Sequence, residues 1–172
     1  MLLDIDGWES DNDSYNDVVL IAVEKKLGVK LPASYIDLMK VWNGCYFEDE
    51  YQVPIENDVP QELSYYLGDG FWALSSIAGL SLDESNDSGI LYTSSSASEW
   101  GVPNGVIAFC GDGHTWLALD YRNEKLDEPS VIFIESDDLN SFVISNNFID
   151  FLKKLIPSDQ VYDYDGNIIY QK

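Results

Sequence analysis

The spacing of apolar positions, every three to four residues, predicts two helices near the N-terminus. Ser14 is a suitable N-cap for a helix over residues 15–27, and Gly28 follows where a left-handed residue commonly ends a helix. Pro32 suits the first turn of a second helix, because its fixed φ fits there and its missing N–H has no partner in that turn. Asn43-Gly44 ends this helix. Its apolar stripe consists of Tyr35, Leu38, Met39 and Trp42.

Apolar runs in the second half of the chain predict strands. Residues 106–110 are apolar throughout, which predicts a central strand buried on both faces. Residues 111–113 predict a turn, and residues 114–121 alternate between two faces, so the whole segment predicts a hairpin. Residues 130–135 predict a third strand.

The C-terminal part predicts one helix and one hairpin. A helix over residues 145–155 carries a core stripe, and Pro157 follows its end. Asp165-Gly166 separates residues 161–164 from residues 168–170, which predicts a terminal hairpin. The stripe of the helix consists of Phe148, Phe151, Leu152 and Leu155.

The middle of the chain has a different character. Residues 41–121 contain no Lys or Arg. The pattern predicts two short strands and long surface loops, with residues 81–98, rich in Ser, Asp and Asn, as the most flexible loop. The acids of this segment are Glu48, Asp49, Glu50, Glu56, Asp58, Glu62, Asp69, Asp83, Glu84, Asp87, Glu99, Asp112 and Asp120.

Length and composition predict one packed domain. The chain has 172 residues, of which 45% are hydrophobic, and this is enough for a core without a metal or disulfide. We expect an acidic arm over residues 1–14, a core over residues 15–156 and an extension over residues 157–172. Cys45 and Cys110 are too few for a disulfide scaffold and are expected to be reduced, buried thiols.

The net charge of the chain excludes some classes of binding partner. Nine Lys and Arg against 31 Asp and Glu give a net charge of −22, which excludes binding to nucleic acid or anionic lipid through clustered bases. The sequence has no basic, apolar leader and no apolar run of membrane-spanning length, so we expect a cytoplasmic protein. A basic protein partner fits this charge.

Residues able to carry chemistry are few. His114 is the only histidine, and Cys110 precedes it across the predicted turn without the sequence context of a nucleophile. A zinc site needs three or four Cys and His ligands, and the chain offers only Cys45, Cys110 and His114. No acidic run fits the spacing of a calcium-binding loop. A pair of carboxylates, as used in glycoside hydrolysis, is no evidence of catalysis in a chain with 31 Asp and Glu residues. We therefore predict no enzyme activity, no metal and no cofactor.

Four segments in order resemble the signatures of the SUKH superfamily. The first is residues 27–44, with a Leu-Pro helix start, a Tyr three residues later and a terminal Asn-Gly. The second is residues 106–122, the third residues 129–135 and the fourth residues 145–155. The resemblance covers roughly residues 15–156. The matching positions include Leu31, Pro32, Tyr35, Trp42, Asn43, Gly44, Trp116, Leu117, Asp120, Phe148, Phe151 and Leu152, to which we assign structural roles.

The resemblance implies an α+β fold, with a twisted, mainly antiparallel sheet and helices packed around it. Many bacterial members of the superfamily are immunity proteins, which bind a toxin domain, often a nuclease, and block it. Eukaryotic relatives include a yeast regulator of cell-wall synthesis that acts through protein contacts. Neither branch is known for catalysis.

These observations lead to the hypothesis of a monomeric immunity protein that docks an acidic face on a basic toxin domain, most plausibly a nuclease. The alternatives are a regulatory scaffold with several partners and, less favoured, a small hydrolase using a carboxylate pair. Trp72 and Trp100 are better contact candidates than Trp42 and Trp116, which we expect in the core. The predicted face, placed in loops, consists of Tyr46, Glu48, Asp49, Glu50, Glu56, Asp58, Asp69, Trp72 and Asp112.

Overall fold

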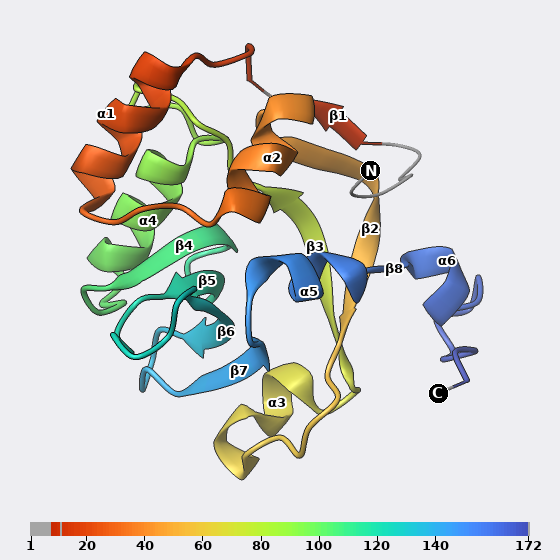
Figure 1. Ribbon diagram of the computed structural model, residues 1–172. Coiled ribbons are helices and arrows are strands. Elements are labelled where there is room, and N and C mark those ends of the chain that lie inside the picture. The colour runs from red at the N-terminus through yellow and green to blue at the C-terminus, as the bar shows by residue number, and fades with distance from the viewer. Residues whose placement is uncertain (1–7, 11, 172) are drawn as a thin grey trace.

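The fold contains two antiparallel sheets surrounded by helices. It was obtained as a computed structural model, which describes residues 8–10 and 12–171 (Figure 1). The strands are β1 (Trp8–Ser10), β2 (Cys45–Pro54), β3 (Phe71–Ile77), β4 (Val106–Gly111), β5 (Thr115–Asp120), β6 (Ser130–Glu135), β7 (Ser141–Ser145) and β8 (Ile156–Pro157). The helices are α1 (Asp17–Leu27), α2 (Ala33–Val41), α3 (Ser64–Leu67), α4 (Ile90–Glu99), α5 (Phe148–Lys153) and α6 (Ser158–Val161), with a 3₁₀ turn at Gln61–Leu63.

The strand order confirms the predicted α+β class but divides the predicted sheet in two. One sheet has the order β1-β2-β3, with β8 also pairing to β2, and the other has the order β4-β5-β6-β7. The Ala78 N–H, just after β3, donates a hydrogen bond of 2.9 Å to the Phe109 carbonyl oxygen of β4. The sheets therefore meet at the β3–β4 seam.

Strands β4, β5 and β6 are buried on both faces, as the continuous apolar run at 106–110 predicts for β4. The prediction that this run is a central strand is wrong, because β4 ends the order of its sheet and lies at the seam with β3. Leu117 and Leu119 of β5 pack into the larger core cluster, which also contains the apolar faces of α2 and α5. Trp116 and Ala118 point to a smaller cluster that includes Ala97 of α4. Alternation along β5 thus separates two cores, and β4, β5 and β6 all lie where the sequence places them.

The first two helices are confirmed with one change at the start of α1. The helix begins at Asp17, and Asn16 rather than Ser14 is its N-cap, because its side-chain oxygen accepts the Val19 N–H. Gly28 ends the helix at φ 74°, as predicted. Pro32 directly precedes α2.

The middle of the chain is more regular than predicted. The predicted short strand and loop are replaced by β2, which is ten residues long and contains Glu48, Asp49 and Glu50. The prediction of a flexible loop over residues 81–98 is wrong in its second half, because α4 begins at Ile90. Serine-rich helices give a weak sequence signal, yet Ile90, Leu91, Thr93 and Ala97 bury one face of this helix.

The C-terminal predictions also need correction. The last core helix begins at Phe148, with Asn147 as its N-cap, and residues 141–145 form β7 instead. The predicted terminal hairpin reduces to one bridge between Tyr162 and Ile168, because Val161 belongs to α6. Of the predicted acidic arm, residues 8–10 form β1, and residues 1–7 and 11 lie outside the described residues. No helix in the described part of the chain is long and apolar enough to cross a membrane.

Candidate functional site

The Asn-Gly pair at the end of α2 forms a buried junction with the end of β3. The Asn43 Nδ2 group donates to the carbonyl oxygens of Asp13 and Leu80 at 2.7 and 3.0 Å, and its Oδ1 accepts the Leu80 N–H at 2.7 Å. Gly44 has φ 83°, and a Cβ there would lie 3.3 Å from the backbone of Gly79. The pair therefore fixes the point from which β2 starts.

Tyr35 connects α2 to both sheets. Its ring is fully buried and packs on Phe148 of α5, with ring centroids 4.8 Å apart, and on Phe109 of β4. Its hydroxyl donates to the Ala78 carbonyl oxygen beside the seam. Burial raises the pKa of this phenol well above its ordinary value, so the hydroxyl keeps its proton as a donor.

Asp120 ends β5 and holds Arg122. The carboxylate accepts the Arg122 N–H at 3.0 Å and two guanidinium contacts at 2.8 Å. Burial alone would raise the pKa of Asp120, but the hydrogen bonds from Arg122 outweigh it and leave the pKa below its ordinary value. The hydrogen bonds and the lowered pKa both indicate that the Asp120 carboxylate stabilises the end of β5.

The first part of the predicted acidic face lies on an irregular stretch of β2. Tyr46 pairs with Ser76 and Tyr51 pairs with Leu74, so residues 47–50 face the single residue Ser75 on β3. Such an insertion bends a strand and pushes the extra residues out of the ladder. Glu48, Asp49 and Glu50 are all exposed here, and we call them the β2 bulge.

The other predicted face residues are dispersed, and several have partners inside the molecule. The Glu56 carboxylate pairs with the Lys154 ammonium at 2.6 Å. Asp112 closes the β4–β5 turn by accepting the N–H groups of His114 and Thr115. Trp72 lies in β3 rather than a loop, half-buried against Phe133.

The two remaining residues, Asp58 and Asp69, are exposed in connections before β3. The structure therefore groups Tyr46 with the β2 bulge and does not place the nine residues on one continuous strand or loop.

A small groove lies between Tyr46 and the end of β4. It has a volume of about 230 Å³ and lies beside the seam of the two sheets. Tyr46, which is 53% exposed, borders it on one side, and Cys110 and Gly111 border it on another. The groove thus separates Tyr46 of β2 from the end of β4, and its lining includes neither the β2 bulge nor Asp112.

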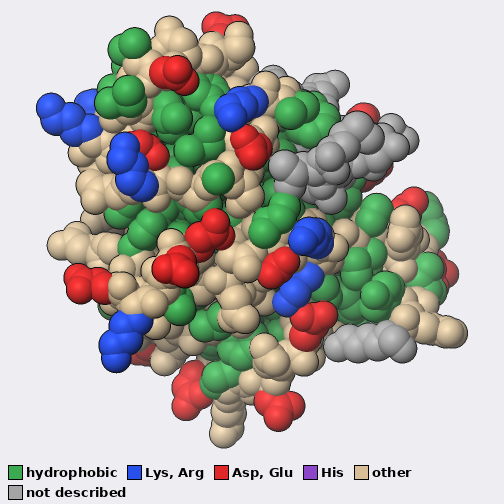
Figure 2. All heavy atoms as spheres, viewed as in Figure 1, with side chains coloured by type: hydrophobic (Ala, Val, Ile, Leu, Met, Phe, Trp, Pro, Cys, Tyr) green, Lys and Arg blue, Asp and Glu red, His purple; other side chains and the backbone are tan. Residues whose placement is uncertain are grey.

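Charged groups are segregated along the chain, because residues 41–121 contain no Lys or Arg. Figure 2 shows Lys and Arg side chains over α1, α2 and α5, interspersed with acids. Of the thirteen acids in residues 41–121, only Glu56, Glu84 and Asp120 form ion pairs among the described residues. The carboxylates of the β2 bulge therefore have no basic partner in the described part of the chain.

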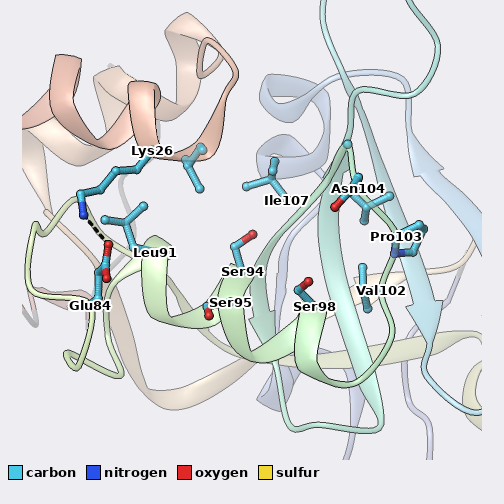
Figure 3. Close-up of a pocket in the computed structure, with 13 residues that line it drawn as sticks. Lys26, Glu84, Leu91, Ser94, Ser95, Ser98, Val102, Pro103, Asn104 and Ile107 are labelled. Atoms are coloured by element: carbon cyan, nitrogen blue, oxygen red, sulfur yellow. Dashed lines mark hydrogen bonds and ion pairs between the residues drawn. The ribbon is translucent and has the colours of Figure 1, made fainter.

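A second hollow, shown in Figure 3, lies between the end of α1, helix α4 and the start of β4. It has a volume of about 450 Å³, and Ser94, Ser95 and Ser98 face it from α4. The Lys26–Glu84 ion pair closes one end. Its polar groups are short hydroxyls and a neutralised ion pair, which supply neither a nucleophile with its base nor a charged anchor for a ligand.

The groups considered for catalysis do not form a reactive set. Burial raises the pKa of the Cys110 thiol to about 11, so the thiol is protonated near neutral pH. The His114 ring lies against the Trp100 ring, with centroids 5.1 Å apart. Among the residues that the structure describes, no cluster of His, Cys, Asp and Glu could hold a metal ion.

One exposed feature was only partly visible in the sequence. Trp100 is a contact candidate in the sequence, but folding brings together three separate segments here: the Trp100 ring lies against the His114 ring, and Gly101, the residue after Trp100, lies next to Leu139. No residue type near Leu139 signals this proximity. A positive φ of 61° at Leu139 is likewise a structural finding.

Comparison with known proteins assigns the family. The search of curated proteins found no match. The model of the SMI1/KNR4 family (SUKH-1) matches residues 15–154, close to the limits of the resemblance in the sequence. This family comprises immunity proteins and SMI1/KNR4 relatives and is generally non-catalytic. With the match covering most of its length, the chain belongs to the SMI1/KNR4 family (SUKH-1).

Proposed function

We propose that this protein is a cytoplasmic, monomeric immunity protein that binds a cognate toxin domain one-to-one and blocks it. The observation that carries the proposal is the β2 bulge, which displays three adjacent carboxylates without basic partners among the described residues. Family membership supports a protein partner of this kind. The bulge would serve as the electrostatic part of the docking surface.

The chemistry of a nuclease matches such a surface. A nuclease holds the phosphates of its substrate with Lys and Arg, so its substrate groove is basic. An acidic protein that enters this groove competes with the substrate and is attracted over a distance of about 10 Å at ordinary ionic strength. The net charge of −22 favours fast association with such a partner.

The test is charge reversal of the bulge, with a matched control. The triple variant Glu48→Lys, Asp49→Lys and Glu50→Lys is compared with Glu124→Lys, Asp127→Lys and Glu128→Lys, which changes three exposed acids on the β5–β6 loop by the same amount. The binding partner is the toxin domain recovered from the native host by affinity capture with the tagged protein. We expect the bulge variant to associate at least ~10-fold more slowly, with a weaker salt dependence. Equal rates for both variants would refute the role of the bulge.

A regulatory scaffold is the second candidate, because the matched family also contains the SMI1/KNR4 relatives. A scaffold would bind several proteins and would not protect cells from a toxin. Co-expression with the captured toxin domain separates the two functions. Survival of the cells favours immunity, whereas toxin killing together with stable binding to several cell-wall proteins favours the scaffold.

A further inference from the structure

Three segments of the chain meet at an exposed apolar patch, which we call the Trp100 patch. It consists of Trp100 after α4, His114 in the β4–β5 turn and Leu139 in the β6–β7 turn. Trp100 is 48% exposed and Leu139 is 41% exposed. The Trp100 ring lies against the His114 ring at an angle of 57°, and a Cβ at Gly101, the next residue, would lie 4.0 Å from the Leu139 side chain. An aromatic and an aliphatic side chain are thus presented together to solvent.

The two turns that carry the patch are locked to each other through Ser136. Its N–H donates to the His114 carbonyl oxygen at 2.9 Å, and its hydroxyl donates to the Gly113 carbonyl oxygen at 3.0 Å. The buried Trp116 indole N–H donates to the same hydroxyl at 2.9 Å. This network connects the backbone of both turns to Trp116 of the smaller core cluster, so the turns that carry His114 and Leu139 are ordered before a partner binds.

The turn that presents Leu139 is held in an unusual backbone conformation. Leu139 has φ 61°, which is unfavourable for a branched residue. The buried Glu135 carboxylate maintains the turn by accepting the N–H groups of Asp137, Asp138 and Asn140 at 2.7, 3.0 and 2.8 Å. The structure therefore keeps an apolar side chain on the surface at a conformational cost that a glycine would avoid.

Acidic residues adjoin the members of the patch along the chain. Glu99, Asp112, Asp137 and Asp138 adjoin its three members in the sequence or in the turns, and all four are exposed. The segments that form the patch, residues 97–121 and 126–152, contain no Lys or Arg. A partner that fits must therefore carry positive charge around an apolar centre.

We propose that the Trp100 patch is the anchor of the docking surface and accepts one large apolar side chain from a region of the partner rich in Lys and Arg. This inference rests on the proposed function and deepens it, because the β2 bulge would govern association while the patch would govern dissociation. Aromatic anchors with a polar rim carry most of the energy in many protein interfaces. The adjoining acidic residues make the patch selective for a basic surface.

The first test uses a defined probe and does not need a toxin. A short amidated peptide with one Trp between flanking Lys and Arg is titrated into the ¹⁵N-labelled full chain, and the same peptide with Ala in place of Trp is the control. We expect chemical-shift changes centred on residues 99–101, 112–114 and 137–140, and about tenfold weaker binding of the Ala peptide. Shifts centred elsewhere, or equal affinity for both peptides, would overturn the proposal.

The second test uses the toxin domain and variants of the patch. Trp100→Ala should speed dissociation at least ~30-fold, in the range of an interface anchor. Leu139→Gly should also speed dissociation without lowering the melting temperature, because glycine adopts this backbone readily. The control is Leu126→Gly, which removes a similarly exposed leucine from the β5–β6 loop and should leave dissociation unchanged.

The outcomes separate the two proposals. If the toxin is neutralised but both patch variants release it at the wild-type rate, the patch is not the anchor, and the immunity function stands. If no toxin is bound, the proposed function fails, and the peptide titration alone decides whether the patch binds a basic, apolar-centred partner.

Discussion

Replacing Asn43 by alanine should destabilise the fold by about 4 kcal/mol. Asn43 is 4% exposed and makes three hydrogen bonds, to Asp13 and to both backbone groups of Leu80. Each bond contributes roughly 1 kcal/mol net, and leaving the buried Leu80 N–H without its acceptor adds about 1–3 kcal/mol. The loss is large because the same side chain joins the end of α2 to the end of β3.

Urea unfolding and thermal melting measure this effect. For a domain of this size, about 4 kcal/mol corresponds to roughly 10 °C in melting temperature. Asn16→Ala is the matched control, because it removes an exposed N-cap with a single hydrogen bond and should cost about 1 kcal/mol. If Asn43→Ala loses no more stability than Asn16→Ala, at an unchanged dependence on urea, the argument from the buried junction is wrong.

Two further predictions concern titratable groups. Burial opposes ionisation of Glu135, but the hydrogen bonds from Asp138, Asn140 and Asp137 outweigh this effect, so the pKa of Glu135 lies below the ordinary 4.5. The stability that the ionised carboxylate contributes is therefore fully present above pH 4.5 and is lost as the pH falls through the lowered pKa. Glu135→Gln should therefore cost about 1–3 kcal/mol at pH 7, with a gap that narrows toward pH 3 in urea titrations; a constant gap would contradict the ionic role. The Cys110 thiol, with a pKa raised to about 11 by burial, should resist alkylation by iodoacetamide at pH 8 in the native protein and react in urea. Rapid native alkylation at Cys110, located by mass spectrometry, would show that burial does not protect it.

The parts of the fold that were predicted have strong local signals. The run at 106–110 is apolar on both faces, and the Gly-Asp-Gly turn fixes the hairpin that follows. Pro32 and the stripe of Tyr35, Leu38 and Met39 define α2 equally well. These elements owe their form to side chains within about ten residues, so the sequence alone is sufficient.

The parts that were missed depend on contacts far apart in the chain. Residues 48–50 resemble a loop in the sequence because three acids in a row disfavour a strand. In the structure, pairing with β1 and β3 before them and with β3 and β8 after them makes β2 one strand with these residues at its irregular point. Helix α4 is serine-rich and is stabilised by burial of Ile90 and Ala97 rather than by propensity. The sequence did not predict α4 within residues 81–98, because the smaller core cluster against which Ala97 packs forms only in the folded protein.

The candidate site was predictable in charge but not in geometry. The absence of bases from residues 41–121 is visible in the sequence, and it correctly marks a surface with few internal ion pairs. The partners of Glu56 and Asp112, however, come from folding, and they leave those two carboxylates less available than the β2 bulge. Charge counting locates the region, whereas hydrogen bonds decide which members are free to bind.

The structural and recognition roles occupy different layers of the molecule, and this has a consequence for specificity. The junction at Asn43 and the Asp120–Arg122 pair stabilise backbone positions inside the fold or at strand ends. The β2 bulge and the Leu139 turn both interrupt regular strand pairing. The bulge is flanked by residues of β2 that pair with β3, and the turn is held by hydrogen bonds to the Glu135 carboxylate. Substitutions on these outward segments change charge and shape without touching the core. On the proposed docking surface, a change of partner therefore needs new side chains at the bulge and the patch, while the buried junctions can stay as they are.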